Sequence, residues 1–105
     1  MPIQRHRPSR LPFVAGVQVT AIDTGAQISA HTEDLTLFGC YVETITPFAL
    51  GTKVAIRISH SGTVVVAQGK VAHSEKGSGM GIRFTSIEPN SQSTLDDWVT
   101  QLRAT

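Results

Sequence analysis

Residues 53–72, KVAIRISHSGTVVVAQGKVA, carry the pattern that decides the fold of this chain. Val54, Ile56 and Ile58 alternate with polar or small residues, which is the period of a strand with one buried face. The HSG sequence at residues 60–62 supplies a turn, and a second, longer strand follows it. Gly69 lies inside that second strand, where a glycine is expected to mark a bulge or a bend.

The same period of two extends over most of the chain. Six strands are expected, at about residues 13–21, 26–32, 40–45, 53–59, 63–72 and 80–85. The alternation breaks over residues 33–39, and short turns rich in glycine, proline or serine separate the other strands. Short strands with short connections predict an antiparallel barrel or sandwich.

After Pro89 the period changes to 3.6 residues. An apolar stripe with helical spacing is formed by Leu95, Trp98, Val99 and Leu102. We expect an amphipathic helix at about residues 91–103, with this stripe, Trp98 included, buried against the strands. Asn90, Ser91 or Ser93 is expected to cap its N-terminus.

Composition restricts the class of protein. The chain has 105 residues, enough for one domain with a single core. Hydrophobic residues make up 40% and charged residues 16%, so intrinsic disorder is not expected. A net charge of +1 does not favour bulk binding to nucleic acid. No apolar run approaches the roughly 20 residues that span a bilayer, so membrane insertion is not expected.

Cys40 is the single cysteine of the chain, which excludes an internal disulfide and a cysteine-clustered zinc site. It begins a strand and has no basic neighbour in sequence, so we interpret it as a buried structural thiol. The N-terminus lacks the apolar segment of a secretory signal, and a reducing cytoplasm is the expected compartment.

The first twelve residues differ from the rest of the chain. They hold three arginines, a histidine and three prolines without an acidic residue. Proline fixes φ and removes backbone donors, so residues 1–12 are expected to form a flexible basic arm. Residues 13–105 are expected to form the single folded domain.

Motifs of enzymes are missing from the sequence. It has no G-x-S-x-G, no P-loop and no H-E-x-x-H. The four histidines have no helical i, i+4 pairing that would suit a metal, and they are His6, His31, His60 and His73. We therefore expect neither an enzyme, nor a metal site, nor a cofactor.

Two features stand out together: the RHRPSR sequence of the arm at residues 5–10, and DLTLFG at residues 34–39. Together with MGIRF at residues 80–84 and the closing helix, they resemble the PilZ domain family. That family binds the bacterial second messenger cyclic diguanylate. The resemblance covers nearly the whole chain and implies a six-stranded antiparallel β-barrel with a C-terminal helix.

The family's marks are R-x-x-x-R in the arm, followed by D/N-x-S-x-x-G. No two arginines of this arm are four residues apart. Taking Arg10 as the second arginine places His6 at the first, whereas taking Arg5 as the first places Ser9 at the second. Thr36 replaces the usual serine and keeps its hydroxyl. The resemblance implies a ligand site made of Arg5, His6, Arg7, Arg10, Asp34, Thr36 and Gly39.

The chemistry of the ligand suits these residue types. Guanidinium groups can donate in pairs to guanine O6 and N7 and can bind phosphate oxygens. The carboxylate of Asp34 can accept from guanine N1–H and N2–H, and Thr36 can donate its hydroxyl. Gly39 would allow a sharp turn and a close backbone approach.

Other interpretations remain open. Asp34 and Thr36 can satisfy backbone donors in a turn, Gly39 can be a turn glycine, and the arm can be a solvated terminus. The domain can also be a protein-protein interaction adaptor of the same fold that no longer binds nucleotide. Binding of single-stranded nucleic acid through the basic arm is less favoured, because it relies on aromatic side chains that stack on bases, and several of the few aromatic residues are needed in the core. A downstream protein partner is expected in either case.

Overall fold

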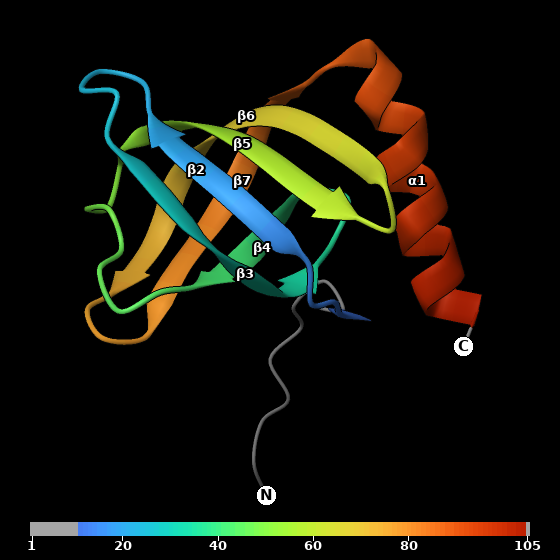
Figure 1. The fold of residues 1–105 in the computed structure, drawn as a ribbon, viewed down its shortest axis with the longest axis horizontal. Coiled ribbons are helices and arrows are strands. Elements are labelled where there is room, and N and C mark those ends of the chain that lie inside the picture. Colours follow the sequence, from blue (N-terminus) through green and yellow to red (C-terminus); the bar gives the residue numbers. More distant parts are fainter. Residues whose placement is uncertain (1–10, 105) are drawn as a thin grey trace, which may run out of the picture.

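The computed structural model describes residues 11–104 of the chain, so Arg5, His6, Arg7 and Arg10 lie outside the described residues. Within these described residues, seven strands precede one helix (Figure 1). The strands are β1 (Leu11–Pro12), β2 (Gly16–Ala21), β3 (Gln27–Leu35), β4 (Gly39–Glu43), β5 (Lys53–His60), β6 (Thr63–Glu75) and β7 (Gly79–Ile87). The helix α1 spans Pro89–Ala104.

The predicted six-stranded antiparallel barrel is confirmed. The strands are ordered β3-β2-β5-β6-β7-β4, and a further pairing of β3 with β4 closes the ring. All neighbours are antiparallel. The short strand β1 is an addition to the ring. It comprises the last two residues that the sequence assigned to the arm, and it pairs with the end of β3.

Register shifts at three places mark bulges in the described barrel strands. The register between β3 and β4 shifts between Thr32 and Asp34, so β3 continues through a stretch that the sequence analysis placed in a break. The extra residue at Glu33 reverses the alternation of the sequence there, which hid the strand. The register between β6 and β7 shifts twice. The shift between Gln68 and Gly69 confirms an irregularity at Gly69, although the extra residue there is Thr85 of β7, and the shift between Val71 and His73 adds Ala72 on β6.

The apolar faces of all six barrel strands meet inside the ring. The largest fully buried apolar side chains are Leu35, Ile56, Ile58 and Met80 of the strands and Leu95 of the helix. The helix lies at the right of the barrel in Figure 1 and packs on β6 and β1. Leu95, Trp98 and Val99 are buried as predicted, while Leu102 is partly buried against the core.

The start of α1 differs from the expected cap. The helix begins at Pro89, where a missing N–H leaves no donor unsatisfied, and the carbonyl of Glu88 accepts from the backbone of Ser91 and Gln92. The Ser91 hydroxyl accepts a hydrogen bond from the Val66 N–H at 2.8 Å. Ser91 therefore attaches the helix to β6 instead of capping it.

Thr32 is one of two buried polar residues in the described part of the chain, and it ties β3 to the start of β2. Its hydroxyl donates to the carbonyl of Phe13 at 2.5 Å and accepts from the N–H of Ala15 at 3.0 Å. These bonds satisfy two backbone groups that water cannot reach.

Replacing Thr32 with valine keeps the shape of the side chain and removes the hydroxyl. We expect Thr32→Val to lower the free energy of unfolding by about 1–3 kcal/mol, the cost of unsatisfied buried polar groups. Urea unfolding measures this change. The control is Thr85→Val on the exposed part of β7, which should change stability by less than about 0.5 kcal/mol. Equal effects of the two substitutions would contradict a stabilising role for the hydrogen bonds of the Thr32 hydroxyl.

Candidate functional site

The D-x-T-x-x-G sequence forms the tight connection between β3 and β4. The backbone N–H of Thr36 donates to the carbonyl of Gly39 at 2.9 Å. The hydroxyl of Thr36 accepts from the N–H groups of Phe38 at 3.0 Å and Gly39 at 3.1 Å. Thr36 therefore holds the shape of the turn, as the turn interpretation of the sequence expected.

Asp34 lies one residue before the end of β3 and is half-buried. One of its carboxylate oxygens, Oδ1, accepts from the backbone N–H of Tyr41 at 3.1 Å. Tyr41 is also the residue opposite Asp34 on β4. This bond holds the carboxylate at the outer edge of the turn.

Strand β1 brings the arm to this turn. Pro12 pairs with Asp34, and Leu11 pairs with Leu35. The arginine-rich residues directly precede Leu11 in the chain, so the arm joins the barrel beside the acidic residue of the motif. Segments more than twenty residues apart in sequence thus meet at one place.

Gly39 is required by the fold. A Cβ at this position would overlap the carbonyl oxygen of Ile82 and lie 3.2 Å from the Cα of Arg83. The close approach that the sequence predicted for Gly39 is therefore an approach of β4 to β7. Glycine is the residue that permits it.

Phe38 is a residue of this turn that the sequence analysis did not select. Its side chain is 66% exposed, whereas its neighbour Leu37 packs partly against the core. Its carbonyl accepts from the N–H of Phe84 at 2.7 Å, which places the turn beside β7. The sequence did contain a signal for Phe38, because Leu37 and Phe38 are two apolar residues in a turn, where polar residues are usual.

Cys40 lies beneath the motif turn, on the inner face of β4. Burial, followed by the charge of Asp34, raises the pKa of its thiol to about 12. A thiol with this pKa is protonated near neutral pH and is a poor nucleophile. The interpretation of Cys40 as a buried structural residue is confirmed.

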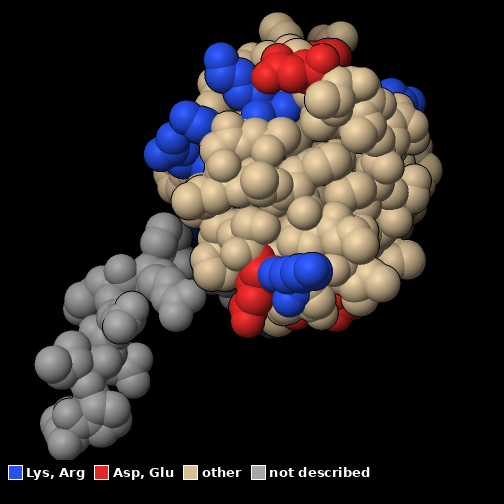
Figure 2. Space-filling view, turned by 90° about the vertical axis from the view of Figure 1, so that its left-hand side faces the viewer, with Lys and Arg blue, Asp and Glu red and all other residues tan. Residues whose placement is uncertain are grey.

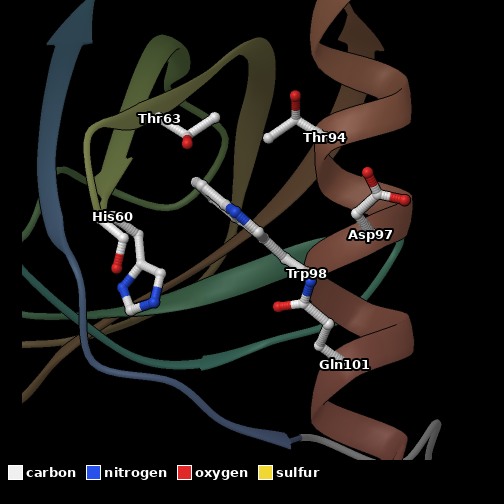
Figure 3. A pocket seen from close by; sticks show the side chains of 7 residues that line it. His60, Thr63, Thr94, Asp97, Trp98 and Gln101 are labelled. Atoms are coloured by element: carbon white, nitrogen blue, oxygen red, sulfur yellow. The ribbon is translucent and has the colours of Figure 1, made fainter.

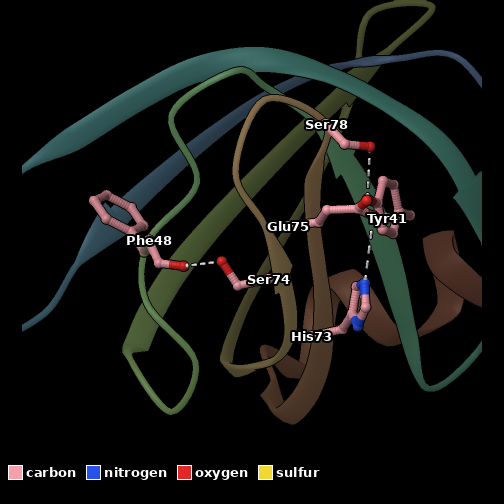
Figure 4. A network of polar contacts seen from close by, with 6 residues as sticks. All are labelled: Tyr41, Phe48, His73, Ser74, Glu75 and Ser78. Atoms are coloured by element: carbon pink, nitrogen blue, oxygen red, sulfur yellow. Dashed lines mark hydrogen bonds and ion pairs between the residues drawn. The ribbon is translucent and has the colours of Figure 1, made fainter.

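On the outer face of the sheet, Tyr41 lies across two glycines of β7. A Cβ at Gly79 would come within 2.7 Å of the Tyr41 ring. The Tyr41 hydroxyl lies 3.4 Å from that of Ser78, and its ring centroid lies 6.4 Å from that of His73. Figure 4 shows these side chains together, with His73 also 4.0 Å from the carboxylate of Glu75. The cluster fixes the position of the tyrosine ring next to Asp34.

A separate open pocket of about 280 Å³ lies between α1 and the β5–β6 turn. Figure 3 shows Trp98 reaching from the helix towards His60, with Thr94, Asp97 and Gln101 on the same helix. The rings of His60 and Trp98 are 5.7 Å apart. This edge-to-face contact joins the helix to the barrel, and we interpret the pocket as structural.

The described residues, 11–104, contain no group of three or more side chains suited to a metal ion. Within the same range, no helix has the length and apolar character needed to cross a membrane.

The family model of the PilZ domain matches residues 4–101. The chain belongs to the PilZ domain family. Comparison with curated protein sequences gave no match.

Several solved structures share the fold. The PilZ domain of CeSA from a cellulose-synthesizing bacterium is 24% identical, with a TM-score of 0.72, and the match covers 91% of this chain and 99% of that one. The PilZ domain of YcgR from Escherichia coli, solved with c-di-GMP, is 20% identical with a TM-score of 0.73, covering 96% and 93%. The inhibitor of motility MotI/DgrA from Bacillus subtilis is 16% identical with a TM-score of 0.75, covering 97% of this chain but 53% of that one.

The raised pKa of Cys40 predicts a dependence of stability on alkaline pH. In the unfolded chain the thiol loses its proton near its ordinary pKa of 9.0, whereas in the folded protein it keeps the proton until about pH 12. The unfolded state then binds fewer protons, so the free energy of unfolding falls as pH rises between these values. The expected slope from this group approaches about 1.4 kcal/mol per pH unit.

Cys40→Ala removes this contribution. Urea unfolding at pH values of about 8 and about 10 should show a smaller loss of stability in the variant than in the parent. The comparison concerns the slope, because the substitution also lowers stability at every pH by leaving a cavity. Parallel pH profiles would show that the thiol does not stay protonated in the folded state.

Proposed function

We propose that this PilZ domain is a binding module that senses cyclic diguanylate through the arm and the β3–β4 turn. The observation that carries the proposal is the pairing of β1 with β3, which sets Pro12 opposite Asp34. This pairing joins the basic arm to the barrel beside a fixed carboxylate. The YcgR domain of the same fold was solved with this ligand, and the family membership supports the same ligand class here.

Each part of the site has a chemical role in this proposal. The carboxylate of Asp34 accepts from the N1–H and N2–H edge of guanine. Arg5, Arg7 and Arg10, with His6, donate to the other guanine edge and to the phosphates. Thr36 and Gly39 shape the turn, and Thr36 also offers its hydroxyl to the ligand. The exposed ring of Phe38 provides a face on which a base can stack.

The proposed module has no catalytic role, and its output is an altered contact with a protein partner. Cyclic diguanylate is its ligand, and the proposal needs no further cofactor. The proposed location is the cytoplasm, where the single cysteine would stay reduced.

A second candidate is a protein-binding adaptor, favoured by the opposite end of the barrel. Ile22, Ile45 and Leu50 are 47%, 74% and 69% exposed there. Backbone bonds hold the β4–β5 loop, including the Gly77 N–H to the Ile45 carbonyl at 3.0 Å. Figure 2 views this end and shows a broad uncharged face with charged side chains at its upper and lower margins. A parent protein that folds but does not bind cyclic diguanylate would favour this function.

Substitution of Asp34 tests the guanine contact. Asp34→Ala should weaken binding of cyclic diguanylate by about 1–3 kcal/mol, the usual worth of a bidentate base contact, and Arg10→Ala should have an effect of the same size. The matched control is Asp34→Asn, which keeps an acceptor for the Tyr41 N–H and for one guanine donor, and should lose less. Calorimetric titration measures the affinities, and circular dichroism checks the fold. Parent-like binding by Asp34→Ala would refute the contact.

Substitution of His6 tests which residues of the arm occupy the two arginine positions. If Arg10 is the second arginine of the R-x-x-x-R motif, His6 stands at the position of the first. An unperturbed imidazole at that position is mostly uncharged near neutral pH. His6→Arg should then tighten binding by about 1 kcal/mol, the gain from a charge-assisted bond. Lowering the pH from about 7.5 to about 6 should strengthen the parent more than the variant. No gain would indicate that Arg5 or Arg7 already fills the position.

A further inference from the structure

Three basic residues form one row across the outer face of the barrel. Arg83 on β7 lies opposite Gly39 of the motif turn, Lys70 on β6 lies opposite Arg83, and Lys53 on β5 lies opposite Lys70. All three side chains are exposed. The residues that alternate with them, such as Ile82 and Val71, are buried in the core, so the basic side chains point outward.

This row has no structural explanation among its neighbours. Like charges directly opposite each other on adjacent strands repel and lower stability. Within residues 11–104, none of the three forms an ion pair with an acidic side chain. On β6 and β7 the nearest acid along the outer face is Glu75, five residues from Lys70. Within residues 11–104 this row therefore carries positive charge that no ion pair neutralises, which favours an anion.

Two glycines lie on the surface between the row and the motif, and the side chains of Tyr41 and His73 flank Gly81. Gly39 and Gly81 contribute no side chains to this surface, and Tyr41 bounds it on the side of Asp34. Neighbouring strands are about 4.8 Å apart, so Arg83 is one strand from the motif glycine and Lys70 is two. A ligand held at Asp34 can therefore lie on this surface with its phosphates towards Arg83.

We propose that Arg83, supported by Lys70, binds a phosphodiester group of the ligand on the outer face of β7 and β6. This inference rests on the proposed function, because it assigns a further contact to the same ligand. Arginine suits the role, since its guanidinium donates two hydrogen bonds to a phosphate while carrying a full charge. The barrel would thus supply the ligand with cationic contacts in addition to those of the arm. No two arginines of the arm have the R-x-x-x-R spacing.

The test compares Arg83→Gln and Lys70→Gln with Arg57→Gln by calorimetric titration of cyclic diguanylate. Arg57 is an exposed, outward-facing arginine on β5 that pairs with Gln18 and Val66, away from the motif. All three variants lose one positive charge. Arg83→Gln should raise the Kd about tenfold or more and Lys70→Gln about threefold, while Arg57→Gln should leave it nearly unchanged. Added salt should weaken the parent more than Arg83→Gln, because the lost contact is between charges.

Thermal unfolding without ligand separates a binding role from a structural one. Arg83→Gln relieves repulsion from Lys70, so its Tm should equal or exceed that of the parent. Arg83→Gln with the affinity of Arg57→Gln would overturn the inference and leave the proposed function standing. A loss of affinity accompanied by a lower Tm would also overturn it. A folded parent without affinity for cyclic diguanylate would overturn both.

Discussion

The two-sided pairing of β3 is the constraint on which the rest of the structure depends. Its first half pairs with β2, and its second half pairs with β4 on one side and β1 on the other. The change occurs at the bulge after Thr32, whose buried hydroxyl ties β3 to the chain that enters β2. Without this arrangement the sheet would have two open edges, and an open edge exposes unpaired backbone groups.

The same pairing builds the site. Asp34 lies where β3 contacts β1 and β4 at once, and its carboxylate bonds to the backbone of Tyr41. The turn that follows is held by Thr36 and by the close approach of Gly39 to β7. Under the proposed function, polar groups held in this way would lower the cost of ordering them when the ligand binds. The basic row on β7 and β6 begins opposite Gly39 of this turn, and β1, which follows the basic residues in the chain, pairs with β3 at Asp34.

Much of the fold and part of the site could be predicted from local patterns. The alternation in residues 53–72 gave a correct hairpin, and the spacing of Leu95, Trp98 and Val99 gave a correct buried helix face. The end of β3 could not be predicted, because one extra residue at the bulge reverses the alternation that identifies a strand. The role of Ser91 was also hidden, since its hydroxyl bonds to β6 and not to its own helix.

The sequence by itself determined the elements: strands from a period of two, a helix from a period of 3.6, and the motif turn from its residue types. These signals lie within a few residues of each other, so they can be read locally. Only the tertiary structure decided that Arg83, Lys70 and Lys53 form one row and that β1 lies beside Asp34. The physical reason is that strand pairing and register depend on contacts between segments far apart in the chain, which no local pattern encodes.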